Sequence, residues 1–199
     1  MAILQVPVEI SNRHIHLSQA HIEALFGPDY QLTPHKELSQ PGQFACTETV
    51  TLVGPKGSIV GVRVLGPARS ASQIELAATD TFKLGVRPPV RDSGDLMGTP
   101  GLQVVGPNGK LELECGIIIA ARHIHMTPKE SLKFGLKDGA HMSVAIPGPR
   151  GGVFNNVLVR VSPQSALFMH IDTDEGNAFA LHNGDLVNVS VGKLLQVAK

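Results

Sequence analysis

Hydrophobic and polar residues alternate along much of the chain, in short segments that glycine and proline separate. Alternation with a period of two, in segments rich in Val, Ile and Thr, predicts β-strands. These segments are residues 48–53, 58–65, 141–146 and 153–161. Gly-Pro pairs at 54–57 and 148–152 predict tight turns between them, and a further hairpin is predicted within 102–113, turning at 106–109. The pattern therefore predicts a protein built mainly of short strands.

Helical patterns are fewer and shorter. Residues 19–26 and 128–134 each follow a residue suited to cap a helix, Ser18 or Thr127, and each segment ends at a glycine. Residues 81–86 and 178–185 also show helix-to-turn signals. Residues 87–95 fit neither period and predict an exposed connecting loop.

One short string occurs twice, as RHIHLS at residues 13–18 and RHIHMT at 122–127. A helix, strands and a Gly-Pro turn follow each copy in the same order, so the chain contains an internal repeat. Two related halves of this kind predict two small β-barrels with short capping helices, in the mainly β or α+β class.

Composition narrows the functional classes. Lys and Arg number 17, as do Asp and Glu, so there is no net positive charge to attract a nucleic-acid backbone. Trp is absent and only 4% of residues are aromatic, which leaves few side chains for stacking on bases. No apolar run approaches the ~18 residues of a membrane span, and the first residues are too short and uncharged for a signal peptide. We therefore expect no nucleic-acid or membrane partner, in a cytoplasmic protein.

Cysteine adds little chemistry. Cys46 and Cys115 are far apart and lack the C-x-x-C spacing of redox and zinc-ribbon sites. Without a secretion signal, two reduced, buried thiols are expected rather than a disulfide.

Histidine is the stronger signal. On an extended strand the two histidines of His-x-His point the same way and can share a metal ion, whereas on a helix they would diverge. The repeat places a further polar residue among apolar ones in each half, Glu75 and His170. This predicts two three-ligand zinc sites, each with an open position typical of catalytic zinc. The sets are His14, His16 and Glu75, and His123, His125 and His170.

An anion-binding arginine is the next candidate. Arg69 belongs to a small-residue loop, residues 66–72, between the first His-x-His and Glu75, where a guanidinium can bind an anion bidentately. Further cations in this half suit a ligand with several phosphates: Arg13, Lys36, Lys56 and Arg63. Neither a P-loop nor G-x-G-x-x-G is present.

Six segments together resemble the phosphate propanoyltransferases, the PduL-type phosphotransacylases, over about residues 5 to 190. They are residues 8–18 (VEISNRHIHLS), 38–44 (LSQPGQF), 64–69 (VLGPAR), 91–94 (RDSG), 120–127 (AARHIHMT) and 169–175 (MHIDTDE).

The resemblance implies two β-barrel domains with an active site between them, and two zinc ions held by the two ligand sets above. It implies that acyl-CoA and phosphate are converted reversibly to acyl phosphate and CoA, and that Arg69 binds phosphate. Residues at the family's CoA contacts are Ser11, Asn12, Arg13, Lys56, Arg63 and Asn177, with Lys36 a weaker candidate.

The resemblance also implies interleaved domains, one of residues 13–120 and the other of 1–12 with 121–199, and a homodimer. Some relatives carry an N-terminal extension that directs them into a bacterial microcompartment, as in propanediol degradation. Here the first motif begins within ten residues of Met1. Encapsulation and a free cytosolic role in acetyl-CoA or propanoyl-CoA metabolism therefore both stay open.

Two other functional classes stay open beside the transferase. One is a zinc-dependent hydrolase of a thioester or phosphate ester, and the other is a non-enzymatic zinc-binding protein associated with a shell. For the transferase we expect direct transfer without an acyl-enzyme, because zinc can generate the CoA thiolate and Arg69 can compensate phosphate charge. The acyl chain stays open between propanoyl and acetyl.

Overall fold

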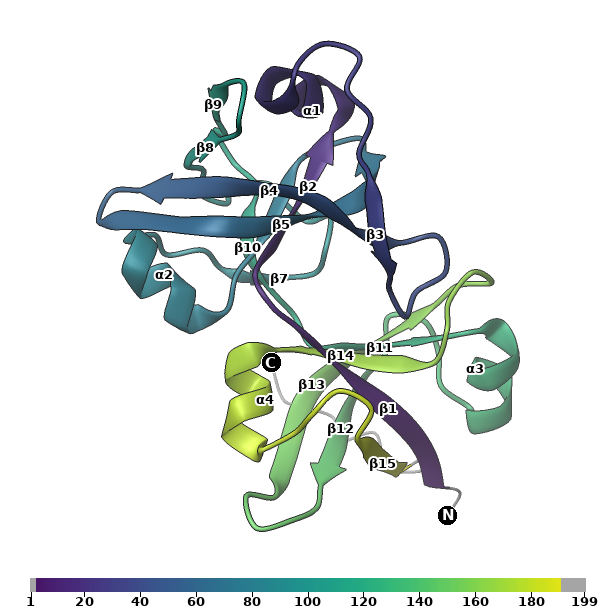
Figure 1. The fold of residues 1–199 in the computed structure, drawn as a ribbon. Helices are drawn as coiled ribbons and strands as arrows, with labels where there is room; N and C mark the ends of the chain where they lie inside the picture. The colour runs from purple at the N-terminus through teal and green to yellow at the C-terminus, as the bar shows by residue number, and fades with distance from the viewer. Residues whose placement is uncertain (1–2, 191–199) are drawn as a thin grey trace. The chain divides into compact units, whose positions relative to one another are not determined.

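The computed structural model describes residues 3–190 (Figure 1), so the ends at 1–2 and 191–199 of the predicted second domain lie outside the described residues. The chain divides into two compact units. Unit 1 contains the chain up to Ser11, the short segment Ser39–Pro41 and the chain from Ala121 onward. Unit 2 contains Asn12–Leu38 and Gly42–Ala120.

Unit 1 is a closed barrel of strands in the order β1-β14-β11-β13-β12-β15. Strand β1 closes it, pairing in parallel with β14 and antiparallel with β15. The strands are β1 (Ile3–Ser11), β11 (His123–Met126), β12 (His141–Ile146), β13 (Gly152–Val161), β14 (Phe168–Asp172) and β15 (Leu186–Ser190). The helices are α3 (Pro128–Phe134) and α4 (Thr173–Phe179).

Unit 2 is a nine-stranded sheet in the order β7-β10-β6-β2-β5-β4-β8-β9, with β3 paired to β4. The strands are β2 (His14–Ser18), β3 (Pro34–Glu37), β4 (Phe44–Gly54), β5 (Gly57–Arg69), β6 (Gln73–Glu75), β7 (Val90–Arg91), β8 (Gln103–Val105), β9 (Lys110–Glu112) and β10 (Ile117–Ala120). The helices are α1 (Gln19–Phe26) and α2 (Ala78–Leu84).

The two units repeat one strand arrangement. Strand β2 lies between β6, its antiparallel partner, and β5, its parallel partner, just as β11 lies between β14 and β13. Strand β10 pairs in parallel with β6, as β1 does with β14. The pairing of β1 with β15 closes unit 1. In unit 2, the strand equivalent to β1 is β10, and its residue Ile117 donates one hydrogen bond of 3.1 Å from N to Pro100 O. The predicted mainly β class is confirmed. Among the described residues, the closed barrel is that of unit 1, and unit 2 is a sheet.

Each unit has its own hydrophobic core, and the middle residue of each His-x-His belongs to it. Ile15 and Ile124 are both fully buried. Ile15 lies between Val64 and Ile74 on the flanking strands. Because successive side chains of a strand point to opposite faces, an isoleucine anchored in the core turns both neighbouring histidines to the other face.

The capping residues predicted from the sequence lie at the starts of α1 and α3. The hydroxyl of Ser18 caps α1 by accepting a hydrogen bond from His21 N, and Thr127 with Glu130 forms a capping box at α3. Helix α4 begins earlier than its sequence signal, because Asp172 caps it and pairs reciprocally with Glu175.

Two expectations from the sequence are wrong in detail. The segment 87–95 is not simply a connecting loop, because its residues Val90 and Arg91 form β7 and pair with β10. Both cysteines are free, but only Cys46 is buried, and Cys115 is exposed. Cys115 comes directly before Gly116, which leads into β10.

Removing the core anchor of either His-x-His strand should destabilise the protein. Ile15→Ala and Ile124→Ala each leave a cavity at a fully buried site, so we expect each to lower the free energy of unfolding by about 2–5 kcal/mol. Val60→Ala serves as the control, because Val60 is 77% exposed and its truncation should change that free energy by less than about 0.5 kcal/mol. Urea denaturation measures all three, and an Ile124→Ala variant as stable as Val60→Ala would contradict this account of the strand.

Candidate metal centres

Strand register brings three candidate ligands together in each unit. In unit 2, His14 lies directly opposite Glu75 on the antiparallel strand β6. In unit 1, His123 lies opposite His170 on the antiparallel strand β14. The second histidine of each pair, His16 or His125, is two residues along the same strand and therefore on the same face. Each set has one ligand atom per residue within 4.8 Å of the others.

The unit 2 set is the more buried of the two. His14 and His16 are 7% and 2% exposed. Nε2 of His14 is 3.5 Å from Glu75 Oε2, and Nε2 of His16 is 3.9 Å from Glu75 Oε1. The carboxylate of Glu75 is thus shared between the two imidazoles, one oxygen to each.

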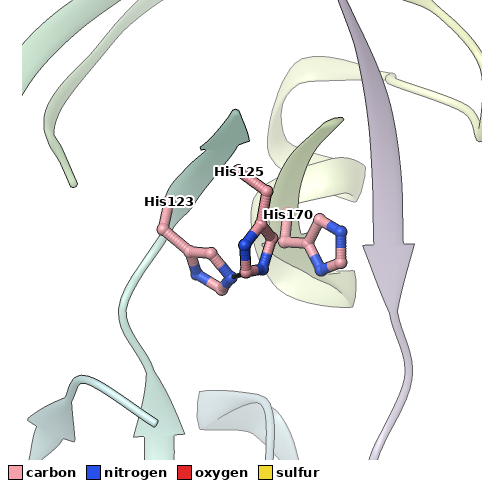
Figure 2. Close-up of side chains that lie close together, drawn as sticks. All are labelled: His123, His125 and His170. Carbon is pink, nitrogen blue, oxygen red and sulfur yellow. Dashed lines mark hydrogen bonds between the residues drawn. The ribbon is translucent and has the colours of Figure 1, made fainter. Parts of the chain in front are cut away.

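The unit 1 set consists of three imidazole rings that lie close together (Figure 2). Nε2 of His123 and Nε2 of His125 are 3.1 Å apart. The ring of His170 completes the group, with its centroid 5.2 Å from that of His123 and 5.0 Å from that of His125.

Hydrogen bonds to the backbone orient the first histidine of each pair in the same way. Nδ1 of His14 lies 2.8 Å from Asn12 O, and Nδ1 of His123 lies 2.8 Å from Ala121 O. A carbonyl oxygen can only accept, so Nδ1 carries the proton and Nε2 keeps a lone pair directed into the site. This is the outer hydrogen bond typical of metal-binding histidine.

The donor sets fit a divalent metal ion. Ligands 2.0–2.2 Å from a tetrahedral zinc ion lie roughly 3.3–3.6 Å from one another. The separations of 3.1 and 3.5 Å are close to that spacing, and the separation of 3.9 Å between His16 and Glu75 is slightly longer. Nδ1 of His16 is buried without a side-chain or backbone hydrogen bond that meets the usual distance and angle among the described residues.

The unit 2 centre also attracts positive charge. Burial by itself would raise the pKa of Glu75, but His14, His16 and Arg69 hold the pKa well below its usual range, so Glu75 is ionised. Burial, with the positive charges of His14 and Arg69, lowers the pKa of His16 to about 3. Burial also opposes a charge on His14, yet the Glu75 carboxylate outweighs burial and raises the His14 pKa. A cation between His14 and Glu75 is therefore favoured.

In unit 1 a neutral imidazole is favoured at His125. Burial lowers the pKa of His125 to about 3, with contributions from His123 and from Arg160. Neutral imidazole is the form that coordinates metal ions. Arg160 lies opposite His125 in the parallel pairing of β11 with β13. The sequence analysis did not select Arg160, although the repeated Val-Arg-Val at 62–64 and 159–161 pointed to it.

A hydrogen-bonded network joins Arg69 to Glu75. Nη1 of Arg69 is 3.2 Å from Ser93 Oγ, and Nε2 of Gln73 donates to Glu75 Oε1 at 2.5 Å and to Ser93 Oγ at 2.8 Å. The backbone N of Gly94 donates to Gln73 Oε1 at 2.8 Å. Gln73 and Ser93 were not among the predicted site residues. Gln73 shares a strand face with Glu75, and Ser93 lies in the RDSG segment, so both had a signal in the sequence.

In each unit, the arginine that precedes His-x-His forms an ion pair with an acidic residue. The two acidic residues lie at equivalent positions of the repeat. Nη1 of Arg13 is 2.6 Å from Asp80 Oδ1, and Nε of Arg122 is 2.9 Å from Glu175 Oε1. Asp80 and Glu175 are each five residues after the third candidate ligand, in the first turn of the following helix. Each ion pair thus joins the strand that carries the histidines to the helix that follows the third ligand.

Comparison with known proteins identifies the family. A model described as phosphate propanoyltransferase matches residues 7–182. The phosphate propanoyltransferase of Thermotoga maritima is 57% identical over 183 residues, which cover 92% of this chain and 87% of the relative. Those of Rhodobacter capsulatus and Salmonella typhimurium are 53% and 52% identical, covering 92% and 89% of this chain and 86% and 85% of the relatives. The chain belongs to the phosphate propanoyltransferase family. It is therefore an enzyme of the acyltransferase class.

The residues that the sequence analysis named as candidates for CoA contact belong to both units. Ser11, at the end of β1, and Asn177, on α4, belong to unit 1. In unit 2, Nη1 of Arg63 donates to Cys46 O at 2.9 Å and to Thr47 O at 2.8 Å. The remaining candidates in unit 2 are Asn12 and Arg13 before β2, Lys36 on β3, and Lys56 in the turn between β4 and β5.

The helices of this phosphate propanoyltransferase family member are all short. Among residues 3–190, none has the length and apolar character that crossing a membrane requires.

Proposed function

We propose that the protein interconverts a short-chain acyl-CoA, propanoyl-CoA or acetyl-CoA, and phosphate with acyl phosphate and CoA. The observation that supports this most is the pair of convergent ligand sets, placed at the same point of both repeated units in a phosphate propanoyltransferase family member. CoA, phosphate and a second copy of the chain are the partners of this proposal. Its location is the cytoplasm, either free or within a bacterial microcompartment.

Two zinc ions are the proposed cofactors. His14, His16 and Glu75 would hold one, and His123, His125 and His170 the other. Zinc, when bound, removes the proton of a thiol and polarises a carbonyl or phosphoryl oxygen. Three side-chain ligands leave a coordination position for substrate, as in catalytic zinc sites.

The proposed role of Arg69 is to bind the phosphate group. Ser93 lies between Arg69 and the unit 2 centre, because its Oγ is 3.2 Å from Nη1 of Arg69 and 3.4 Å from Oε1 of Glu75. The hydrogen bond to Ser93 fixes one side of the Arg69 guanidinium. A fixed guanidinium can compensate the charge that develops on phosphate during acyl transfer. The proposed CoA contacts are Ser11, Asn12, Arg13, Lys56, Arg63 and Asn177.

We propose that the acyl group moves directly between the two substrates. The CoA thiol gives its proton to solvent, and the thiolate sulfur forms a bond to the carbonyl carbon of the acyl phosphate. The carbon–oxygen bond to phosphate breaks, and phosphate leaves with the electron pair and takes up a proton from solvent. An acyl-enzyme would need a reactive cysteine. Burial and the negative charge of Glu48 raise the pKa of Cys46 to about 11, so its thiolate is scarce at neutral pH.

An assay of CoA release tests the proposed activity. Propanoyl-CoA or acetyl-CoA should release CoA only when phosphate is present, and acyl phosphate should form in equal amount. Release of free acid without phosphate would instead identify a thioester hydrolase.

Arg69→Ala should lower kcat/KM for phosphate by about 30-fold or more, corresponding to loss of a contact of ~2–4 kcal/mol. Arg87→Ala removes an exposed arginine and should leave the rate unchanged.

Metal content is a separate prediction. Elemental analysis of the purified protein should find about two zinc ions per chain. Glu75→Ala should remove one zinc ion and His170→Ala the other, whereas His35→Ala, a control at an exposed histidine, should retain both. Two zinc ions in all three variants would refute the ligand assignment.

Direct transfer makes a prediction about the cysteines. The Cys46→Ala/Cys115→Ala variant should keep most of the activity, with stability losses of about 1–2 kcal/mol from the buried site. Initial-rate plots against the two substrates should intersect, because both must be bound together. A folded, zinc-loaded double variant without transfer activity, or parallel lines and a trapped acyl-cysteine in the parent enzyme, would favour an acyl-enzyme instead.

A further inference from the structure

A short loop connects Arg69 to the strand that carries Glu75. Residues 70–72 join β5, which ends at Arg69, to β6. The first two residues of this loop are exposed, whereas Ser72 is 6% exposed. Arg69 itself pairs with Ser18 at the end of β2. The backbone of Arg69 is therefore held by β2 on one side and continues directly into this loop.

Ser72 fastens the end of the loop to the start of α1. Its Oγ accepts a hydrogen bond of 2.9 Å from the backbone N of Ser18 and lies 2.7 Å from Nδ1 of His21. A hydroxyl oxygen can accept one hydrogen bond and donate its own proton in another, so Ser72 can satisfy both contacts. Ser18 thus pairs with Arg69 and also binds Ser72, so that both ends of this segment are held at one residue of β2.

The repeat shows another way to satisfy the same backbone group. In unit 1, the backbone N of Thr127 donates to Oε2 of Glu130, three residues later, at 2.8 Å. The residue at the same place in α1 is His21, which has no carboxylate. The backbone N of Ser18 donates to Ser72 instead, a residue 54 positions away in the sequence. Unit 2 thus has a long-range hydrogen bond where unit 1 has a local one.

The long-range bond occurs in the unit that contains Arg69. In unit 1, the loop between β13 and β14, residues 162–167, contains neither arginine nor lysine, and α3 has its own capping box. In unit 2, the corresponding loop directly follows Arg69, and Ser72 ties it to α1. A helix of this type can therefore be capped without the loop, which indicates that the tie in unit 2 serves the arginine.

We propose that Ser72, together with His21, is a positioning residue of Arg69. The two contacts of its hydroxyl hold residues 70–72 against the start of α1, and this keeps the Arg69 guanidinium beside Ser93, where Nη1 is 3.2 Å from Oγ. A side chain that is already in place when an anion arrives loses less conformational freedom on binding. The proposal rests on the phosphate-binding role of Arg69 in the proposed function and deepens it.

Initial rates with phosphate as the varied substrate test the proposal. Ser72→Ala should lower kcat/KM for phosphate by about 10–100-fold, as a small misplacement of a binding group does, and leave KM for acyl-CoA unchanged. His21→Ala should act in the same direction, whereas Ser70→Ala, at an exposed residue of the same loop, should behave as the parent. In the Arg69→Ala background, Ser72→Ala should lower kcat/KM by less than about twofold further. Parent kinetics in Ser72→Ala, or an equal loss in both backgrounds, would overturn the proposal.

A further variant separates positioning of the loop from stability of the helix. Glutamine in place of His21 can accept the hydrogen bond from Ser18 N, as Glu130 does for Thr127. The Ser72→Ala/His21→Gln variant should therefore unfold at the parent's urea midpoint and still use phosphate poorly. Recovery of phosphate use together with stability would show that Ser72 serves only the helix, and would overturn the proposal.

The crystal structure of the Ser72→Ala variant gives a readout that does not depend on turnover. We expect the Arg69 guanidinium to be displaced and its hydrogen bond to Ser93 to be lost. A guanidinium in the same place as in the parent protein would overturn the proposal, and the proposed function would survive if Arg69→Ala still impaired the use of phosphate. If Arg69→Ala left the use of phosphate unchanged, the proposed role of Arg69 would be wrong, and the displacement would still decide whether Ser72 positions it.

Discussion

The antiparallel pairing of each His-x-His strand with its neighbour is the constraint on which the candidate chemistry depends. Antiparallel residues directly opposite each other have Cβ atoms about 4.5–5.5 Å apart, the right distance for two side chains to share one ion. His14 meets Glu75 in this way, and His123 meets His170. A shift of one residue would turn the third ligand to the opposite face and dismantle the centre.

The hydrophobic core enforces that register. The residue between each pair of histidines is an isoleucine, and its flanking partners Val64, Ile74, Val159 and Met169 belong to the same cores. A slip of one residue would move the isoleucine out of the apolar core and put a histidine into it, so burial of apolar surface and placement of the candidate ligands favour the same register. Stability and the geometry of the centre therefore have one physical origin.

The two centres have the same strand arrangement but differ in the charged side chains around them. Unit 2 places a carboxylate among its ligands and keeps Arg69 nearby through Ser93 and Gln73. The unit 1 set consists of histidine alone, and the carboxylate beside it is Glu9, whose Oε2 is 3.1 Å from Nε2 of His170. Membership in the phosphate propanoyltransferase family makes the protein an acyltransferase, and the reaction proposed above would use both centres.

The sequence by itself determined the local structure and the nature of the ligands. Period-two alternation marked the principal strands, and capping residues marked α1 and α3. The repeated RHIH string nominated four histidines, and polar residues at matching places of the repeat added Glu75 and His170. The structure brings these six residues together in two groups. The contacts of Glu9, Ser72, Gln73 and Ser93 were decided only by the tertiary structure. Ser18 and Ser72 are far apart in the chain, and no periodicity records which loop will pack beside which strand. Local pattern follows from backbone geometry, whereas hydrogen bonds between distant segments follow from how the strands are ordered and packed.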